Sequence, residues 1–361
     1  MNGVFSRRLA EYLLTRCPGL ATIRLSEMRL ASGGWSDETY LFRMDGTDHH
    51  GQPHTRELAL RKRLPGGLLA GASDFRRHYD LLALVGRHTS LPVPRAYLYE
   101  GDASILGAPF FIMSKLEGNP VVPWSKPGRE FLQRAHDQGV VPEQFVQYLA
   151  ALHGLDLDAV EAGRAAPVPA AGYGYIDRKL GELEQQFAEY RTGPDPLWVD
   201  AFSWLVSNRP RRDRYVLLHG DYRTGNMLYG ESGITAILDW QAAEIGDPMS
   251  DLGYVAARLN RMDSPLLCYL LDRDRFFRRY QELSGIPVES DAVHYYQVLH
   301  QVRFVLLALS AGQTFAASAR PDLRLARQGL RWPLMRLLLA EEMGYKPIQG
   351  VNGCDSAAQN I

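Results

Sequence analysis

The residues best suited to chemistry lie close together between positions 217 and 239. Residues 217–228 read LLHGDYRTGNML, so Asp221 follows one apolar run and Asn226 comes five positions later, just before another. A third apolar run ends at Asp239, in the sequence AILDW. Phosphoryl transfer needs a carboxylate that accepts the proton of the attacking hydroxyl, and oxygen ligands for Mg²⁺ bound to phosphates. This pattern predicts Asp221 as the base and Asn226 and Asp239 as metal ligands.

The same residues also allow a purely structural interpretation. Asp221 and Asn226 would then belong to an Asx-rich hairpin, and Asp239 would cap a helix. All three in this order, each beside an apolar run, favour the catalytic interpretation. In protein kinases the catalytic loop has the same Asp-to-Asn spacing, and a later Asp binds the metal.

The motifs HGDxxxxN at 219–226 and DWx₅GDPxxDL at 239–252 together resemble the aminoglycoside phosphotransferase/choline kinase family. This resemblance covers residues of about 30 to 345. It implies a small-molecule kinase that uses ATP and Mg²⁺, with Asp221 and Arg223 in the catalytic group and Asn226 and Asp239 on the metal. It also implies a structural carboxylate at Asp251.

The nucleotide is expected to contact two segments of the first third. Residues 32–40, SGGWSDETY, resemble the loop that covers the phosphates in this family, and glycines allow the backbone to approach them closely. Residues 110–118 resemble the strand that meets the adenine. The residues assigned to nucleotide binding in these segments are Gly33, Gly34, Ser36, Met113 and Lys115.

The position of the phosphate-binding lysine of kinases is held by Arg61, although a shift of one residue would place Lys62 there. Arginine can form two hydrogen bonds to phosphate oxygens. The helix that normally supplies a glutamate partner carries His78 instead. Asp74, four residues earlier on the same helix face, is a candidate substitute. Without a substitute, either the geometry of bound ATP is altered or the chain binds nucleotide without efficient turnover. The second case, a nucleotide-binding pseudokinase, is the alternative to an enzyme.

The elements around these motifs predict an α+β chain in two lobes. The resemblance implies the bilobal protein-kinase-like fold, with a small antiparallel β-rich lobe and a larger helical lobe. We expect the first lobe at 1–116, the second at 117–345, and a disordered tail at 346–361. Strand-like patterns occur at 23–30, 39–44, 57–64, 95–100 and 109–116. Helical patterns occur at 6–15, 74–85, 143–153, 175–190, 196–207, 273–283, 292–311 and 323–342.

The histidines at 45–54 and His153 are interpreted as structural. Residues 45–54 contain three histidines, but no carboxylate or cysteine framework accompanies them, so this segment is expected to be an exposed hairpin loop. His153 is expected to be a packed and hydrogen-bonded residue of the helical lobe.

The composition excludes several classes of partner. With 40 basic and 41 acidic residues, the chain has a net charge of -1, which favours neither nucleic acid nor an anionic membrane. Its three cysteines form no CxxC pair, and no apolar run is long enough to span a bilayer. Residues 1–8 lack the apolar core of a signal peptide, so a cytoplasmic location is expected. The oligomeric state is left open.

The acceptor is suggested by one detail of the catalytic loop. The form DYRxGN, together with Arg61 and residues 65–67, PGG, resembles the branch of phosphotransferase domains associated with acyl-CoA dehydrogenases. This branch implies a 4-hydroxyacyl-CoA acceptor in acid catabolism. The arginines of residues 209–214 are candidates for contacts with CoA phosphates, or else form a solvated loop. An aminoglycoside or amino-alcohol acceptor is the alternative within the same chemistry.

Overall fold

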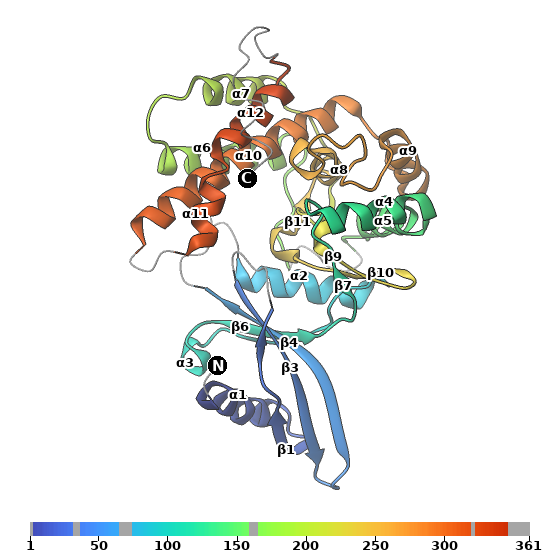
Figure 1. Ribbon diagram of the computed structural model, residues 1–361, viewed down its shortest axis with the longest axis vertical. Helices are drawn as coiled ribbons and strands as arrows, with labels where there is room; N and C mark the ends of the chain where they lie inside the picture. The colour runs from blue at the N-terminus through green and yellow to red at the C-terminus, as the bar shows by residue number, and fades with distance from the viewer. Residues whose placement is uncertain (1–2, 32–36, 65–73, 159–164, 319–321, 346–361) are drawn as a thin grey trace.

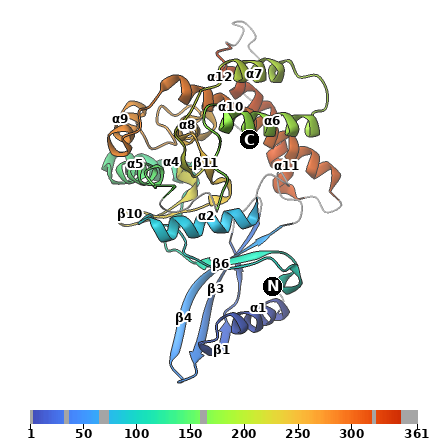
Figure 2. The same ribbon diagram turned by 180° about the vertical axis from the view of Figure 1, so that it is seen from behind.

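The computed structural model describes residues 3–31, 37–64, 74–158, 165–318 and 322–345. These residues form a small β-rich lobe and a larger helical lobe, joined by a short connection (Figures 1 and 2). The predicted α+β, bilobal kinase-like fold is therefore confirmed. The predicted phosphate-loop positions Gly33, Gly34 and Ser36 and the predicted tail at 346–361 lie outside the described residues.

The small lobe is built on an antiparallel sheet with the strand order β1-β3-β4-β6-β5, in which β2 also pairs with β3. The strands predicted at 39–44 and 57–64 form the long central pair, β3 and β4, and both extend beyond the predicted runs into polar residues. The bounds are β1 Leu20–Leu25, β2 Arg29–Leu30, β3 Asp37–Asp48, β4 Pro53–Arg63, β5 Ala96–Glu100 and β6 Phe110–Ser114.

Two helices cover opposite faces of this sheet. Helix α1 (Gly3–Arg16) buries Leu9 and Leu13 in a core that belongs to the small lobe alone. Helix α2 (Phe75–His88) lies between the sheet and the large lobe (Figure 1), and its apolar side chains join the core of that lobe. The short helix α3 (Ala103–Leu106) leads into β6. Helix α2 thereby joins this face of the sheet to the core of the large lobe.

The large lobe is organised around the long helix α10, which packs against α6, α7, α8, α11 and α12. The bounds are α4 Lys126–Gln138, α5 Val140–His153, α6 Gly174–Tyr190, α7 Pro196–Ser207, α8 Pro248–Ala256, α9 Arg273–Ser284, α10 Ser290–Ala317, α11 Leu323–Gly329 and α12 Trp332–Glu342. In the described parts of the chain, no helix combines the length and apolar character needed to cross a membrane.

Two small sheets position the predicted catalytic residues. Strands β7 (Asn119–Pro120), β9 (Met227–Gly230) and β10 (Gly233–Ile237) form one of them, in the order β10-β9-β7. Strands β8 (Val216–Leu218) and β11 (Glu244–Gly246) form the other. The predicted base therefore lies in the loop between β8 and β9, while Asp239 comes directly after β10. Both motifs meet at the ends of paired strands, as the sequence pattern predicted.

Candidate active site

The loop between β8 and β9 is anchored by a buried carboxylate. Asp251, on α8, is fully buried and accepts hydrogen bonds from the backbone N–H groups of His219 and Gly220, both at 2.8 Å. Gly220 has a φ of 76°, and a Cβ there would lie 2.2 Å from the Ala242 carbonyl oxygen, so the turn requires glycine. Burial raises the pKa of Asp251, but hydrogen bonding to His153 and the histidine charges outweigh it and lower the pKa.

The carboxylate of Asp221 is oriented by two side chains. Arg223 Nε donates to Asp221 Oδ1 at 3.0 Å, and the Tyr254 hydroxyl donates to the same oxygen. Burial and then the Asp221 charge raise the pKa of Tyr254 far above its ordinary value, so its hydroxyl keeps its proton. Within the described residues, Asp221 Oδ2 accepts no hydrogen bond, and this oxygen is available to a substrate hydroxyl.

Tyr254 is absent from the residues predicted from sequence. It stands three positions after Asp251 on α8, and residues three apart share one face of a helix. Asp251 contacts the catalytic loop in the structure, and the same helix face also presents Tyr254 to it. The i, i+3 spacing is thus a signal that sequence reasoning can use.

His219 links the catalytic loop to the strand before Asp239. Its Nδ1 accepts from the Asp221 backbone N–H at 3.2 Å, which leaves the proton on Nε2 for donation to the Leu238 carbonyl at 2.9 Å. Burial lowers the pKa of His219, while the charges of Asp251 and Asp221 oppose this shift. A neutral imidazole in this tautomer therefore fixes the spacing between the two predicted catalytic segments.

The predicted metal ligands present oxygen atoms suited to Mg²⁺. Asn226 donates through Nδ2 to the Asp221 carbonyl at 2.9 Å, so its amide oxygen is turned away and remains an acceptor. Asp239 has a φ of 62°, a strained conformation for a residue other than glycine. Its side chain is 44% exposed. An amide oxygen and an accessible carboxylate fit a cation that also takes oxygens from phosphates and water.

Arg61 reaches across the cleft from β4. It is buried, and its nitrogens lie 3.1 Å from Asp37 Oδ2, 3.1 Å from Asp239 Oδ1 and 2.6 Å from Gln241 Oε1. Lys62 points to the other face of the sheet, where it pairs with Glu38 at 3.2 Å. Of the two candidates, Arg61 is the residue directed toward the predicted metal site.

The partner of Arg61 differs from the one suggested by the sequence. Asp74 caps α2 by accepting from the backbone N–H groups of Arg76 and Arg77, so it does not substitute for the expected glutamate. Asp37 provides the counter-charge instead. Thr39 is opposite Arg61 in the β3–β4 register, so Asp37 is a diagonal neighbour of Arg61 on the same sheet face.

His78 occupies an aromatic environment rather than an ion pair. Its ring packs edge-on against Phe111, with 5.0 Å between centroids, and against Phe75 at 6.4 Å. Burial, followed by the charges of Arg61 and His219, lowers the pKa of His78 well below its ordinary value. The residue is therefore a neutral packing group beside Arg61.

The remaining predicted residues lie at two separate places. Met113 is half-buried on β6, and Lys115 follows that strand with its ammonium 3.1 Å from Glu57 Oε2; their contact with adenine stays a prediction. His153 is buried, as predicted, and it joins the Tyr280 hydroxyl at 2.7 Å to Asp251 Oδ2 at 3.2 Å.

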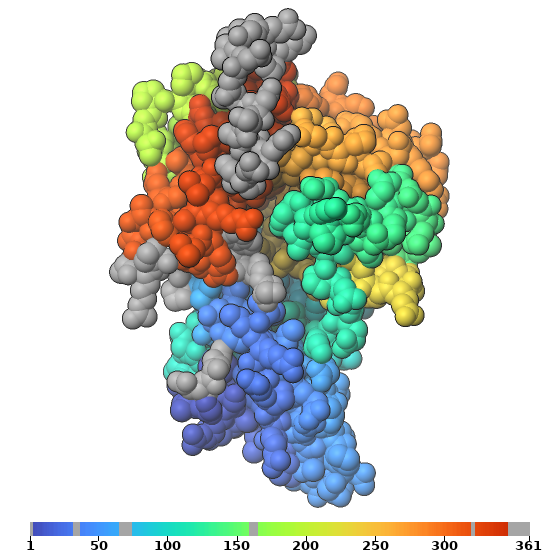
Figure 3. Space-filling model, in the orientation of Figure 1, coloured from blue at the N-terminus to red at the C-terminus, as the bar shows by residue number. Residues whose placement is uncertain are grey.

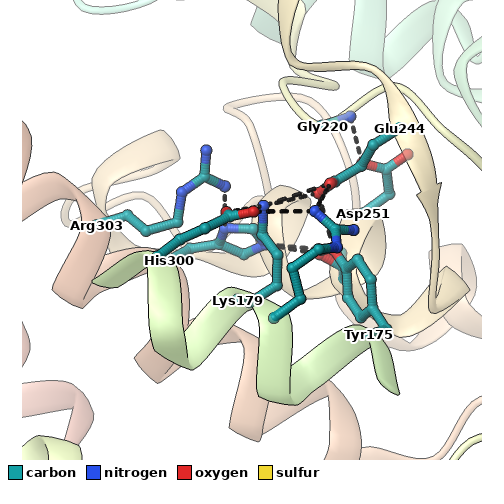
Figure 4. Close-up of polar contacts among 10 residues, drawn as sticks. Tyr175, Lys179, Gly220, Glu244, Asp251, His300 and Arg303 are labelled. Carbon is teal, nitrogen blue, oxygen red and sulfur yellow. Dashed lines mark hydrogen bonds and ion pairs between the residues drawn. The ribbon is translucent and has the colours of Figure 1, made fainter. Parts of the chain in front are cut away.

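A buried polar network supports the catalytic loop from behind (Figure 4). Glu244, opposite Leu218 in the β8–β11 pair, contacts Lys179 of α6 at 3.0 Å and accepts from Tyr175 at 3.1 Å. Burial raises the pKa of Glu244, but the charges of Lys179 and Arg178 lower it overall to about 2. This network ties β11, and through it the strand that leads to His219, to α6.

Comparison with known protein families agrees with this fold and this arrangement of residues. Residues 27–292 match the model of the family described as the phosphotransferase enzyme family. The chain therefore belongs to this family, and it is a kinase-type enzyme. It is 27% identical over 298 residues to acyl-CoA dehydrogenase family member 11 of Rattus norvegicus, covering 80% of this chain. This chain spans only 35% of the length of that relative.

Solved structures share the fold at low sequence identity. A crystal structure from Ralstonia eutropha, described as an aminoglycoside phosphotransferase, has a TM-score of 0.68 and 19% identity, and covers 94% of this chain and 99% of that one. A thermostable mutant of aminoglycoside phosphotransferase APH(4)-Ia, in a ternary complex with AMP-PNP and hygromycin B, has a TM-score of 0.56 and 17% identity. The match covers 91% of this chain and 98% of the chain of that structure.

Proposed function

We propose that this enzyme transfers the γ-phosphoryl group of ATP to a hydroxyl of a 4-hydroxyacyl-CoA. The observation that carries the phosphotransferase assignment is the geometry of Asp221. Tyr254 and Arg223 both hold one carboxylate oxygen, and the other is left for the acceptor. A base held in this way needs no reorganisation when the substrate hydroxyl arrives.

The proposed reaction is an in-line displacement. The acceptor oxygen forms a bond to the γ-phosphorus while the bond from that phosphorus to the β–γ bridging oxygen breaks, and ADP leaves. Asp221 Oδ2 accepts the proton of the hydroxyl. Arg223 keeps a positive charge beside the carboxylate, and Tyr254 prevents the side chain from rotating away.

The nucleotide is proposed to lie between the lobes, with Gly33, Gly34 and Ser36 over its phosphates and Met113 and Lys115 near its base. Asn226 and Asp239 would hold Mg²⁺, which neutralises phosphate charge during transfer. Arg61 is positioned on the same side by Asp37, so a counter-charge is present although the helix glutamate is absent. The pseudokinase alternative, which rested on His78, therefore loses its main support.

The acyl-CoA acceptor is supported by the relative named as an acyl-CoA dehydrogenase family member and by the form of the catalytic loop. The alternative is an aminoglycoside acceptor, as in the complex with hygromycin B. An aminoglycoside is a polycation, and such drugs need acidic pockets. Here the side chain next to the base is Arg223. A positive group at this position favours an anionic acceptor.

The experiment that tests the proposal is an acceptor panel. ATP consumption is measured with Mg²⁺ and 3-, 4- and 5-hydroxyacyl-CoAs, kanamycin, choline or homoserine, with Asp221→Ala as the blank. We expect turnover with a hydroxyacyl-CoA, and the most rapid turnover with the 4-hydroxy isomer. Turnover with kanamycin or choline alone would overturn the acceptor assignment and leave the mechanism in place.

A further inference from the structure

A pocket beside the catalytic loop is lined by residues that none of the predicted roles uses. It is a cavity of about 270 Å³ between α4 and residues 262–269, lined by Arg129, Gln133, Met262, Asp263, Ser264 and Tyr269. This volume lies below the range of roughly 300–1,000 Å³ that holds a whole drug-sized ligand. The cavity is therefore sized for one group of a larger molecule.

Contacts on both sides connect this pocket to the catalytic base. Arg129 Nη1 donates to the Trp124 carbonyl at 3.1 Å, and the Arg223 guanidinium lies over the Trp124 ring, 5.9 Å from its centroid. Arg223 in turn bonds Asp221. On the other side of the pocket, the Thr224 hydroxyl donates to the Cys268 carbonyl at 2.9 Å. The pocket wall is therefore linked to Asp221 through Trp124 and Arg223.

The guanidinium groups around the pocket have few acidic partners. Among the described residues, Arg129 in the pocket wall donates only to a carbonyl. Arg331 is half-buried and lies outside the lining residues, and the described chain offers its side chain neither a hydrogen bond nor an ion pair. Arg261 donates to the Ser264 carbonyl at 3.1 Å, while its buried Nε has no partner in the described chain. The pocket carboxylate Asp263 is 3.3 Å from Arg258, which offsets its charge.

Electrostatic effects agree with an excess of positive charge. Burial, and then the charges of Arg327 and Arg223, lower the pKa of Arg331. Burial raises the pKa of Tyr269, which lines the pocket, and the positive charges of Arg129 and Arg331 oppose this shift. The charges of both arginines therefore act on this side chain.

The arginines of residues 209–214 provide a contrast. Arg209 lies 2.7 Å from Asp177, and Arg212 lies 2.7 Å from the buried Asp247 and 2.6 Å from Glu289. These ion pairs hold their segment against the large lobe, so those two guanidiniums are not free for a ligand. Arg129 and Arg331, by contrast, have no carboxylate partner among the described residues.

The segment that forms the pocket is also conformationally strained. Among the described residues other than glycine, four have a positive φ, and three of these are Met262, Cys268 and Tyr269. Such conformations cost free energy and are concentrated at functional sites. In the space-filling view, the surface is hollowed between α11 and α4 (Figure 3).

We propose that this pocket, with Arg129 and Arg331, binds the phosphate groups of the acceptor and thereby selects phosphate-bearing acceptors over neutral or cationic ones. The inference rests on the proposed function, because it assigns the site that holds the far end of the acceptor. Guanidinium groups without carboxylate partners form strong charge-assisted hydrogen bonds to phosphate oxygens.

The test is direct binding of free coenzyme A, measured by calorimetry with Mg²⁺ and saturating AMP-PNP so that the nucleotide site is already filled. Arg129→Gln and Arg331→Gln are compared with the wild type and with Arg134→Gln, an exposed arginine on the same helix as Arg129. Each pocket substitution is expected to raise the Kd for coenzyme A about tenfold. Arg134→Gln is expected to bind as the wild type does.

Pantetheine, which lacks phosphates, provides the second arm, and its weaker binding is expected to be equal in all four proteins. Equal coenzyme A affinity in the four proteins, or no binding by the wild type, would overturn the inference. Arg129 is exposed, so its variant is expected to fold even if Arg331→Gln does not. Arginine-dependent binding without any turnover of hydroxyacyl-CoA would refute the proposed function and keep the pocket assignment.

Discussion

Tyr254→Phe isolates the hydrogen bond that orients the predicted base. The substitution removes one hydroxyl that donates to Asp221 Oδ1 and leaves the ring packing against His300, with 5.1 Å between centroids. A hydrogen bond to a charged group contributes roughly 1.5–3 kcal/mol. Since about 1.4 kcal/mol corresponds to a tenfold change in rate, kcat is expected to fall by about 10- to 150-fold. The KM for ATP is expected to be unchanged, because the hydroxyl faces the acceptor side.

The matched control is Tyr295→Phe, which removes another buried tyrosine hydroxyl, bonded to the Leu205 carbonyl at 3.0 Å. Steady-state kinetics and thermal unfolding are measured for both variants. Both are expected to lose a comparable amount of stability, and only Tyr254→Phe is expected to lose kcat. A kcat for Tyr254→Phe within about twofold of the wild type would refute the orienting role.

Three further substitutions test the surroundings of the site. Asp37→Asn removes a buried counter-charge of Arg61 and is expected to raise the KM for ATP and to lower stability by about 3 kcal/mol. The control Glu38→Gln is expected to change neither quantity by much. Equal effects of the two substitutions would argue against the pairing of Asp37 with Arg61. The Glu244 pKa, lowered from 4.5 to about 2, corresponds to about 3 kcal/mol of stability that is present above pH 4.5 and lost as the pH falls toward 2. Denaturation of Glu244→Gln from about pH 7 to about pH 3 should show lower stability at neutral pH and less loss on acidification; an unchanged pH dependence would contradict the ion-pair account. His78→Glu is expected not to increase turnover, because Asp37 already supplies a buried counter-charge to Arg61, and a large gain would contradict this.

Those features that depend on local chemistry could be predicted from the sequence. The predicted helix at 196–207 coincides with α7, because Asp195 caps its N-terminus and Pro196 occupies its first turn. The segments predicted to be catalytic could be placed after strands, because each follows an apolar run, and their catalytic role stays a prediction. The division into two lobes could also be predicted, because it follows from the change from strand patterns to helix patterns along the chain.

Features that depend on tertiary contacts could not be predicted from the sequence. The helix predicted at 323–342 is two helices, α11 and α12. At the break, a Cβ on Gly329 would lie 2.7 Å from the Gly312 Cα of α10. The predicted loop at 45–54 is mostly strand, and its turn is stabilised by the Asp48 carboxylate, which accepts from the backbone N–H groups of His50 and Gln52.

The contacts of individual site residues also differ in how far the sequence could predict them. Asp37 as the counter-ion of Arg61 depends on the register of β3 against β4, which one sequence does not reveal. Helix spacing suggested Asp74 as the partner of Arg61. Asp74 is instead the N-cap residue of α2, a position that favours aspartate, and its carboxylate bonds backbone N–H groups. Tyr254 was within reach of sequence reasoning, since it lies one turn after Asp251.

The central claim is Asp221-dependent transfer of phosphate to the hydroxyl of a hydroxyacyl-CoA. The most direct measurement is mass spectrometry of 4-hydroxyacyl-CoA after incubation with ATP, Mg²⁺ and either the wild type or Asp221→Ala. We predict a phosphorylated acyl-CoA, formed with one ADP per product, in the wild-type reaction and none with Asp221→Ala. Equal amounts of this product with both proteins, or ADP formed by the wild type without any phosphorylated acyl-CoA, would contradict the account.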